Sequence, residues 1–261
     1  MTVVKDDMPF VLNQNIRIHY ESIGGGAPLI MHHGTFGSGA DWIDCGYVDA
    51  LKADYQVILL DSRGHGQSDK PHDPRAYDLA LRASDVLAVM DELGIQTADY
   101  FGYSLGGWIG FGLAKYAPER FRSFIFVASH PYAENMQPFR DLMPKDRDAL
   151  SGILDRVFGN RLTPAMRTRL LANDLNALRI LTQDRESNAA VMASMIMPCL
   201  LIVGELDPRL VQVRQCVSEL SNATFFSLPG YDHAALAVCG ELVIPHLKTF
   251  LAKVRNDATY L

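Results

Sequence analysis

The sequence lacks the features that mark several large classes of protein. Its longest apolar runs, such as CLLIV at 199–203, are far too short to cross a bilayer. Acidic residues outnumber basic ones by 30 to 24, and this charge of −6 argues against a nucleic-acid or anionic-membrane partner. The first ten residues show no basic flank before an apolar run, so we expect no signal peptide and a cytoplasmic protein.

Clustered cysteines and metal ligands are also missing. The cysteines are far apart, without CxxC or Cys/His spacing, and we expect buried free thiols: Cys45, Cys199, Cys216 and Cys239. The adjacent His32 and His33 would point to opposite faces of a strand and have no further ligand cluster. RGHGQS at 63–68 is glycine-rich but lacks the lysine of a phosphate-binding loop. We therefore expect neither a metal nor a cofactor.

What the sequence does contain is a regular alternation of buried strands and helices. An alternating stretch at 15–24 predicts a hairpin strand that leads into the next strand. Continuous apolar runs predict strands at 28–32, 55–61, 98–104, 123–129, 199–205 and 224–230. Apolar residues with helical period run from Tyr77 to Leu93, and Gly94 follows as a helix end. This order predicts an α/β fold whose mostly parallel sheet carries helices on both faces.

The stretch 131–195 breaks this alternation, because it is helix-like and charged and has no strand pattern. We expect it to be a helical lid inserted into a core made of residues 1–130 and 196–261. It contains many apolar residues and no basic cluster aimed at the site, which favours an uncharged, partly apolar substrate. Its methionines fit an apolar pocket or helix packing equally well: Met136, Met143, Met192, Met195 and Met197.

The segment GYSLGG at 102–107 sets one serine, Ser104, between a predicted strand and a predicted helix. In a parallel sheet, ligands collect beyond the carboxyl ends of the strands. G-x-S-x-G at such a junction is typical of a nucleophile elbow, a strained turn that leaves the serine hydroxyl free. The motif alone recurs by chance, and a serine here could be an ordinary turn residue. Its context makes Ser104 the predicted nucleophile.

A serine nucleophile needs a general base and an acid that orients the base. His233 follows the strand at 224–230 and a glycine turn, whereas Glu205 and Asp207 follow the strand at 199–205. His233 could instead be an exposed loop residue, and either acid could cap the next helix, since Asp207 precedes a proline. The order serine, acid, histidine, each at the carboxyl end of a strand, favours a triad.

Five segments together resemble the α/β-hydrolase superfamily, in its expected order and across nearly the whole chain. They correspond to the oxyanion loop, the D-x-R-G-x-G-x-S segment, the elbow, the acid segment and the histidine segment: 31–42, 59–71, 102–107, 201–208 and 230–236. The resemblance is to the serine-nucleophile, esterase-like branch. Relatives that act on epoxides or carbon–halogen bonds carry aspartate at the elbow, where this chain has Ser104.

Carried over by position, the resemblance implies the following roles. Ser104 would be the nucleophile and His233 the base. Asp207, rather than Glu205, would be the acid, because its offset from the glycine that ends the preceding strand matches the family. The backbone N–H groups of Thr35 and Leu105 would form the oxyanion hole.

Other residues receive structural interpretations. The resemblance makes His33 a residue that orients the oxyanion loop. Asp61, Arg63 and Ser68 are expected to brace their own turn rather than to take part in catalysis. Trp108, four residues after the serine, is expected in the core rather than in the pocket.

The leading functional hypothesis is a serine hydrolase that cleaves a carboxylic ester or a lactone through an acyl-serine. The expected partner is a small-molecule ester. One alternative keeps the same triad for hydrolytic C–C bond cleavage of a β-diketone-like catabolic intermediate, and turnover of esters but not of diketones would discriminate. Another, from a different class, is a ligand receptor on the same fold, against which the complete triad argues. Covalent labelling together with multiple turnovers would separate it from an enzyme.

Overall fold

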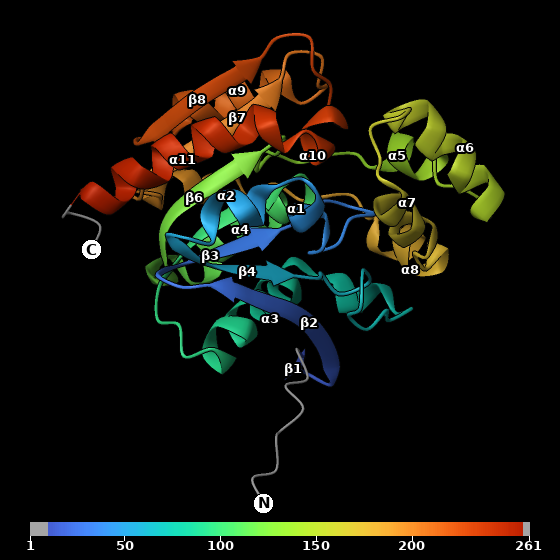
Figure 1. The fold of residues 1–261 in the computed structure, drawn as a ribbon, viewed down its shortest axis with the longest axis horizontal. Helices are drawn as coiled ribbons and strands as arrows, with labels where there is room; N and C mark the ends of the chain where they lie inside the picture. The colour runs from blue at the N-terminus through green and yellow to red at the C-terminus, as the bar shows by residue number, and fades with distance from the viewer. Residues whose placement is uncertain (1–9, 258–261) are drawn as a thin grey trace, which may run out of the picture.

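The computed structural model describes residues 10–257, in which eight strands form one sheet (Figure 1). Their order is β1-β2-β4-β3-β5-β6-β7-β8. The strands are β1 (Phe10–Asn13), β2 (Ile16–Gly24), β3 (Ala27–His32), β4 (Tyr55–Leu60), β5 (Ala98–Tyr103), β6 (Phe121–Val127), β7 (Cys199–Gly204) and β8 (Ala223–Leu228). Strands β3 to β8 pair in parallel, and β1 and β2 are antiparallel. The predicted α/β fold with a mostly parallel sheet is confirmed.

The first strands correct one prediction. We expected β2 to be a hairpin strand leading into β3, but β4 lies between them, antiparallel to β2 and parallel to β3. The hairpin instead joins β1 to β2 through Gln14 and Asn15, which both have positive φ, as a tight hairpin turn requires. Alternation identifies a strand but not its neighbour in the sheet. The stretch 1–9, on which the expectation of no signal peptide rests, lies outside the described residues, as do residues 258–261.

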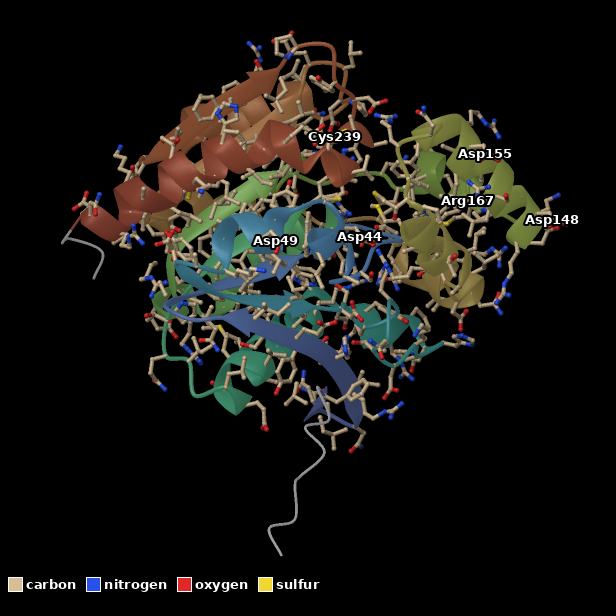
Figure 2. The ribbon with its side chains drawn as sticks, in the orientation of Figure 1. Asp44, Asp49, Asp148, Asp155, Arg167 and Cys239 are labelled. Atoms are coloured by element: carbon tan, nitrogen blue, oxygen red, sulfur yellow. The ribbon has the colours of Figure 1, made fainter. Side chains whose placement is uncertain are left out.

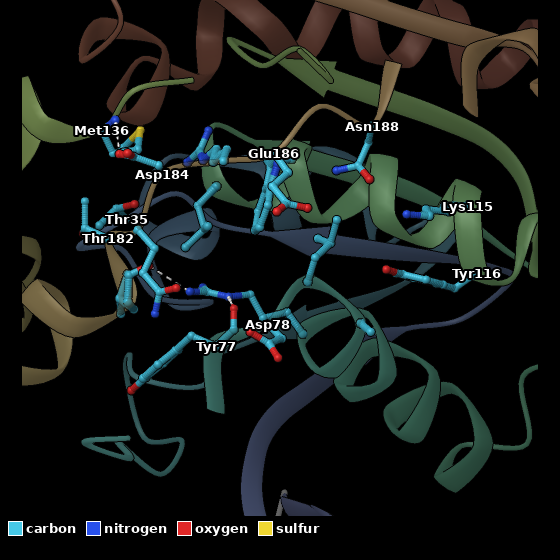
Figure 3. Close-up of a pocket in the computed structure, with 18 residues that line it drawn as sticks. Thr35, Tyr77, Asp78, Lys115, Tyr116, Met136, Thr182, Asp184, Glu186 and Asn188 are labelled. Carbon is cyan, nitrogen blue, oxygen red and sulfur yellow. Dashed lines mark hydrogen bonds between the residues drawn. The ribbon is translucent and has the colours of Figure 1, made fainter. Parts of the chain in front are cut away.

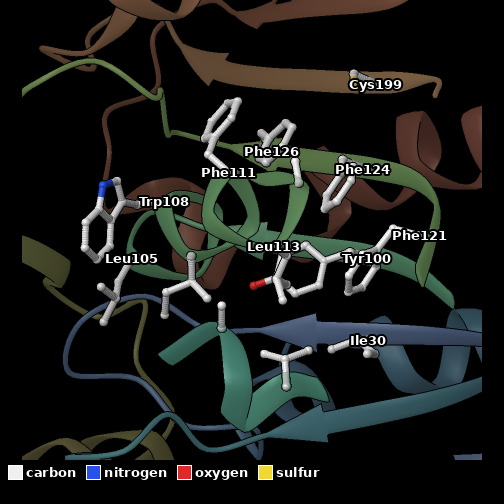
Figure 4. Close-up of a cluster of buried hydrophobic side chains, with 14 of the residues drawn as sticks. Ile30, Tyr100, Leu105, Trp108, Phe111, Leu113, Phe121, Phe124, Phe126 and Cys199 are labelled. Carbon is white, nitrogen blue, oxygen red and sulfur yellow. The ribbon is translucent and has the colours of Figure 1, made fainter. Parts of the chain in front are cut away.

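Helices cover both faces of the sheet, as predicted. One face carries α3 (Leu79–Glu92), α4 (Leu105–Tyr116) and α9 (Leu210–Glu219). The other carries α1 (Asp41–Asp44), α2 (Tyr47–Leu51), α10 (Ala235–Val238) and α11 (Gly240–Asn256). Figure 4 shows the aromatic core of the first face, where Phe111 of α4 stacks on Phe126 of β6 with ring centroids 4.0 Å apart. Gly94 follows α3 with a φ of 67° and ends it where the sequence predicts.

Between β6 and β7 the chain forms helices only, with no strand among its described elements. They are α5 (Gln137–Asp141), α6 (Arg147–Phe158), α7 (Pro164–Leu171), α8 (Leu175–Leu181) and the 3₁₀ helix η3 (Ala189–Ser194). Figure 1 shows α5 to α8 beyond the ends toward which the parallel strands point. Charged side chains such as Asp148, Asp155 and Arg167 lie on α6 and α7 away from the sheet (Figure 2), where Arg167 donates to Asp155 over 2.7 Å. The boundaries 131–195 and the role as a lid remain predictions.

The ends of this insertion are joined to each other. The backbone N–H of Glu134 donates to the carbonyl of Arg185 over 3.0 Å, and the N–H of Arg185 donates back over 2.9 Å. This isolated bridge closes a loop of about fifty residues and fixes where the insertion leaves and rejoins the core. Separately, no helix within residues 10–257 is both long and apolar enough to cross a membrane.

Candidate active site

Ser104 sits in a strained turn between β5 and α4. Its φ of 51° and ψ of −106° lie in a region that residues with a side chain rarely adopt. A Cβ atom at Gly102 would lie 2.5 Å from the carbonyl of Gly106, and one at Gly106 would lie 2.3 Å from the carbonyl oxygen of His32. Strand and helix therefore meet too closely for larger residues. This contact accounts for the G-x-S-x-G pattern.

The structure brings the three predicted site residues together. His233, in the loop after β8, has its Nε2 atom 3.0 Å from Ser104 Oγ and its Nδ1 atom 2.6 Å from Asp207 Oδ2. Burial alone would raise the pKa of the Asp207 carboxyl, but the hydrogen bond and charge of His233 lower that pKa below its usual range. An ionised Asp207 holds the proton of the neutral ring on Nδ1, which leaves Nε2 free to accept from Ser104.

The two acidic candidates after β7 take different positions. Asp207 is buried, and besides His233 it accepts the backbone N–H of Arg209 over 2.9 Å. Glu205 is exposed, and its carboxylate accepts from the Ser227 hydroxyl over 3.0 Å. Of the two acids, Asp207 is thus the one that contacts His233.

The loop after β3 packs against Ser104. A Cβ atom at Gly34 would lie 2.7 Å from the ring of Tyr103 and 3.2 Å from Ser104 Cβ. His33 holds this loop, since its Nδ1 atom donates to the Gly34 carbonyl over 2.7 Å and its Nε2 atom accepts the N–H of Ser62 over 3.1 Å. These contacts fit the expected role of His33. The proposed oxyanion amides of Thr35 and Leu105 remain predictions.

The turn after β4 is held partly by its own bonds, as expected, and partly by bonds to other segments. Asp61 accepts the backbone N–H of Gly39 over 2.7 Å, and the Ser68 hydroxyl donates to the Asp61 carbonyl over 2.7 Å. The Arg63 guanidinium donates to both carboxylate oxygens of Asp85 over 2.6 Å. In the described part of the chain, no hydrogen bond joins any of these three residues to the catalytic candidates.

An apolar cavity of about 340 Å³ opens at Ser104 and His233 and extends into the insertion. Its wall on that side includes Phe139, Leu154 and Phe158. The methionines divide between the two expected roles. Met136 and Met143 line this cavity, whereas the others belong to the core: Met192, Met195 and Met197.

We expected no basic cluster from the insertion at the site. The insertion contributes one arginine to this cavity, Arg185, and the core contributes Arg209. Glu134 pairs with both of them. Glu134 accepts from Arg185 Nη1 over 2.9 Å and from Arg209 Nη2 over 2.5 Å, and Arg209 Nη1 approaches His233 Nδ1 to 3.4 Å. The fold brings Glu134 and Arg185 together across the insertion, so their separation in the sequence gives no sign that they pair. The sequence does place Arg209 two residues after Asp207, which could have indicated an arginine near the site.

The family model of the alpha/beta hydrolase fold matches residues 27–196, which is more than half of the chain. With the sheet and the elbow described above, the chain belongs to the α/β-hydrolase fold family.

Individual relatives are similar over parts of the chain. "Putative carbamate hydrolase RutD" of Azorhizobium caulinodans is 36% identical over 120 residues, 46% of this chain and 44% of that protein. The pimeloyl-[acyl-carrier protein] methyl ester esterase of Vibrio parahaemolyticus is 34% identical over 137 residues, 52% of this chain and 50% of that protein. The chain spans about half the length or less of most curated relatives that it matches.

A solved structure shares nearly the whole fold. A hydrolase from Pseudomonas aeruginosa PA01 superposes with a TM-score of 0.82, covering 95% of this chain and 99% of that one. The sequence identity is 22%, so this likeness shows the fold alone.

Proposed function

We propose that the protein is a serine hydrolase that cleaves a carboxylic ester, or a lactone, of a small, partly apolar substrate. The observation that carries the proposal is the unbroken hydrogen-bond chain from Ser104 through His233 to a buried Asp207, at the mouth of an apolar cavity. Similarity to a protein named as a methyl ester esterase supports an ester as the substrate class.

Acylation follows from the contacts of His233. Ser104 Oγ attacks the carbonyl carbon while His233 Nε2 takes the hydroxyl proton, and the nearby Asp207 carboxylate stabilises the imidazolium that forms. Negative charge develops on the carbonyl oxygen. The amides of Thr35 and Leu105 would hold it, and the N-terminus of α4 would add a favourable dipole.

The remaining steps use the same groups. His233 returns its proton to the leaving alkoxide, the alcohol departs, and an acyl-Ser104 ester remains. His233 then takes a proton from water, whose oxygen attacks the acyl carbon. The acyl carbon–Oγ bond breaks, His233 returns the proton to Ser104 Oγ, and the acid is released. The chain's own side chains carry every proton transfer in this scheme.

We also infer that the insertion sets specificity as a lid. Residues of α5 to α7 supply much of the apolar wall around the cavity, whereas the groups assigned to the chemistry come from the core. Contacts in such a wall act on substrate placement.

Replacing Ser104 by alanine tests the proposal. With p-nitrophenyl hexanoate as substrate, Ser104→Ala should lower kcat by up to about 10⁶-fold, as loss of a triad serine does elsewhere. Ser129→Ala is the matched control, because Ser129 is a buried serine without a hydrogen-bond partner among the described residues. The control should keep its activity and its labelling by a fluorophosphonate. Full esterase activity in Ser104→Ala would refute the assignment.

A further inference from the structure

A second cavity, of about 450 Å³, adjoins the apolar one (Figure 3). Thr35, Met136 and Arg185 line both cavities, so the two meet beside the loop that carries a proposed oxyanion amide. The second cavity lies between helices α3 and α4 of the core and the end of the insertion, residues 181–188. The two cavities are therefore neighbours that share part of their wall.

Charge is unevenly distributed over the lining of this second cavity. Four charged residues that line it are exposed to solvent, and Figure 3 labels all of them: Asp78, Lys115, Asp184 and Glu186. The two buried charged residues are both arginines, Arg82 at 3% and Arg185 at 8% exposed. Water can compensate the exposed charges. The buried charges need partners from the protein or from a ligand.

The partners of Arg82 among the described residues are all neutral, and they include the Tyr77 ring, 5.0 Å from its guanidinium carbon. Its Nε and Nη2 atoms donate to the backbone carbonyls of Tyr77 and Leu181 over 2.7 and 3.0 Å, and among the described residues no carboxylate pairs with it. Its Nη1 atom has no hydrogen-bond partner within the same range. Burial lowers the pKa of Arg82 to about 9, and the nearby charge of Arg185 adds to that shift, so the group is still a cation at neutral pH.

Trp108 places a second unpaired donor on the same cavity. Its indole Nε1 atom is buried and has no acceptor in the described part of the chain. Its ring faces the guanidinium of Arg185 at 5.3 Å. Trp108 was expected in the core and does belong to the buried cluster of Figure 4, but it also lines this cavity. Folded proteins rarely leave buried donors without an acceptor, and here two residues that line one cavity each carry such a donor.

We propose that this second cavity binds a carboxylate of the substrate, which accepts hydrogen bonds from Arg82 Nη1 and Trp108 Nε1. A monoanion matches the one buried arginine of this cavity that has no carboxylate partner among the described residues, because Arg185 pairs with Glu134. The proposal rests on the proposed ester hydrolysis at Ser104. It identifies the substrate class as an ester that carries a free carboxylate remote from the ester bond, in place of the uncharged substrate expected from the sequence.

Pairs of esters that differ only in this charge test the proposal. p-Nitrophenyl hydrogen adipate is compared with p-nitrophenyl hexanoate, and 4-carboxyphenyl acetate with 4-methylphenyl acetate. Arg82→Gln should lower the acid-to-neutral ratio of kcat/KM about 10-fold for at least one pair, and Trp108→Phe should lower it about 3-fold. Lys115→Gln removes an exposed cation from the same cavity and should leave the ratio unchanged. The two esters of a pair differ in intrinsic reactivity, but this difference cancels when the acid-to-neutral ratio of kcat/KM is compared between variants.

The neutral ester reports folding, because a misfolded variant loses both activities together. Equal ratios in the wild type, Arg82→Gln and Trp108→Phe for both pairs would overturn the proposal. Should no ester be cleaved, calorimetry with free adipate provides the second arm. Binding to Ser104→Ala that disappears in Ser104→Ala/Arg82→Gln supports the carboxylate site while the proposed hydrolysis fails, and no binding to either overturns the site. Binding of free acetate without any preference for acid esters would overturn the assignment to the substrate.

Discussion

Two buried arginines, Arg63 and Arg82, have nearly the same exposure and opposite surroundings. Arg63 is 2% exposed and makes two hydrogen bonds of 2.6 Å to the buried carboxylate of Asp85. Arg82 is 3% exposed, and within the described part of the chain it bonds to backbone carbonyls and lies over the Tyr77 ring, with Nη1 unpaired. The difference teaches that burial alone does not separate a structural charge from a binding charge. The two kinds of charge are separated by whether the group has a charged partner and whether it lines a cavity.

The same distinction divides the candidate active site. Around Ser104, His233 and Asp207, each side chain of the hydrogen-bond chain meets the next. Arg82 and Trp108, which line the second cavity, each carry a buried donor without an acceptor among residues 10–257. Under the two proposals, the first region is preorganised for chemistry and the second is complete only with a ligand.

Replacing Asp207 should cause a large loss of activity at the site formed by Ser104, His233 and Asp207. Asp207→Asn should lower kcat for p-nitrophenyl hexanoate about 10⁴-fold at neutral pH, because the imidazole loses the carboxylate that fixes its tautomer. Glu205→Gln, two residues away and exposed, should cost much less. Steady-state kinetics of both variants decide the ranking, and the reverse order would assign the orienting role to Glu205.

Removing each buried arginine tests the comparison directly. Arg63→Gln leaves the Asp85 carboxylate buried without its partner and should lower the free energy of unfolding by about 3–5 kcal/mol. Arg82→Gln leaves no buried acid behind but removes hydrogen bonds to two backbone carbonyls, so its loss should be smaller, about 1–3 kcal/mol. Urea denaturation measures both. An equal loss in the two variants would mean that Arg82 is as structural as Arg63.

Much of the fold was predictable because it depends on local patterns. Apolar runs, the end of α3 at Gly94 and the five motifs in order all carry over to strands, helices and the elbow at Ser104. The contact of Asp207 rather than Glu205 with His233 also agrees with a spacing visible in the sequence. The roles of these residues are still proposals.

The features that escaped prediction depend on which distant segments meet. Nothing in the alternation of β2 indicates that β4 separates it from β3. Glu134 and Arg185 meet only because the insertion closes on itself, and this pairing brings a buried cation to the site. Arg82 occupies one position in an ordinary helical pattern. Only the packing of α3 against the insertion shows that its charge is unpaired.

Glu134 offers the mildest test, because replacing it should make a paired arginine resemble Arg82. Burial alone would raise the pKa of the Glu134 carboxyl, but Arg185 and Arg209 lower that pKa below its usual value. A lowered folded-state pKa contributes stability that is present above the unfolded value, about 4.3, and is lost as the pH falls through the folded value.

Glu134→Gln should therefore lower the free energy of unfolding by about 1–3 kcal/mol at pH 7. The gap from the wild type should shrink as the pH falls toward the lowered folded-state pKa, because the wild-type carboxyl then takes up a proton and also becomes neutral. Urea midpoints between pH 7 and pH 3 follow this convergence, with the exposed Glu186→Gln as a control that should track the wild type throughout. A gap that stays constant or widens in acid would show that Glu134 does not compensate the two arginines. In that case Arg185 would count as unpaired, and the contrast with Arg82 would disappear.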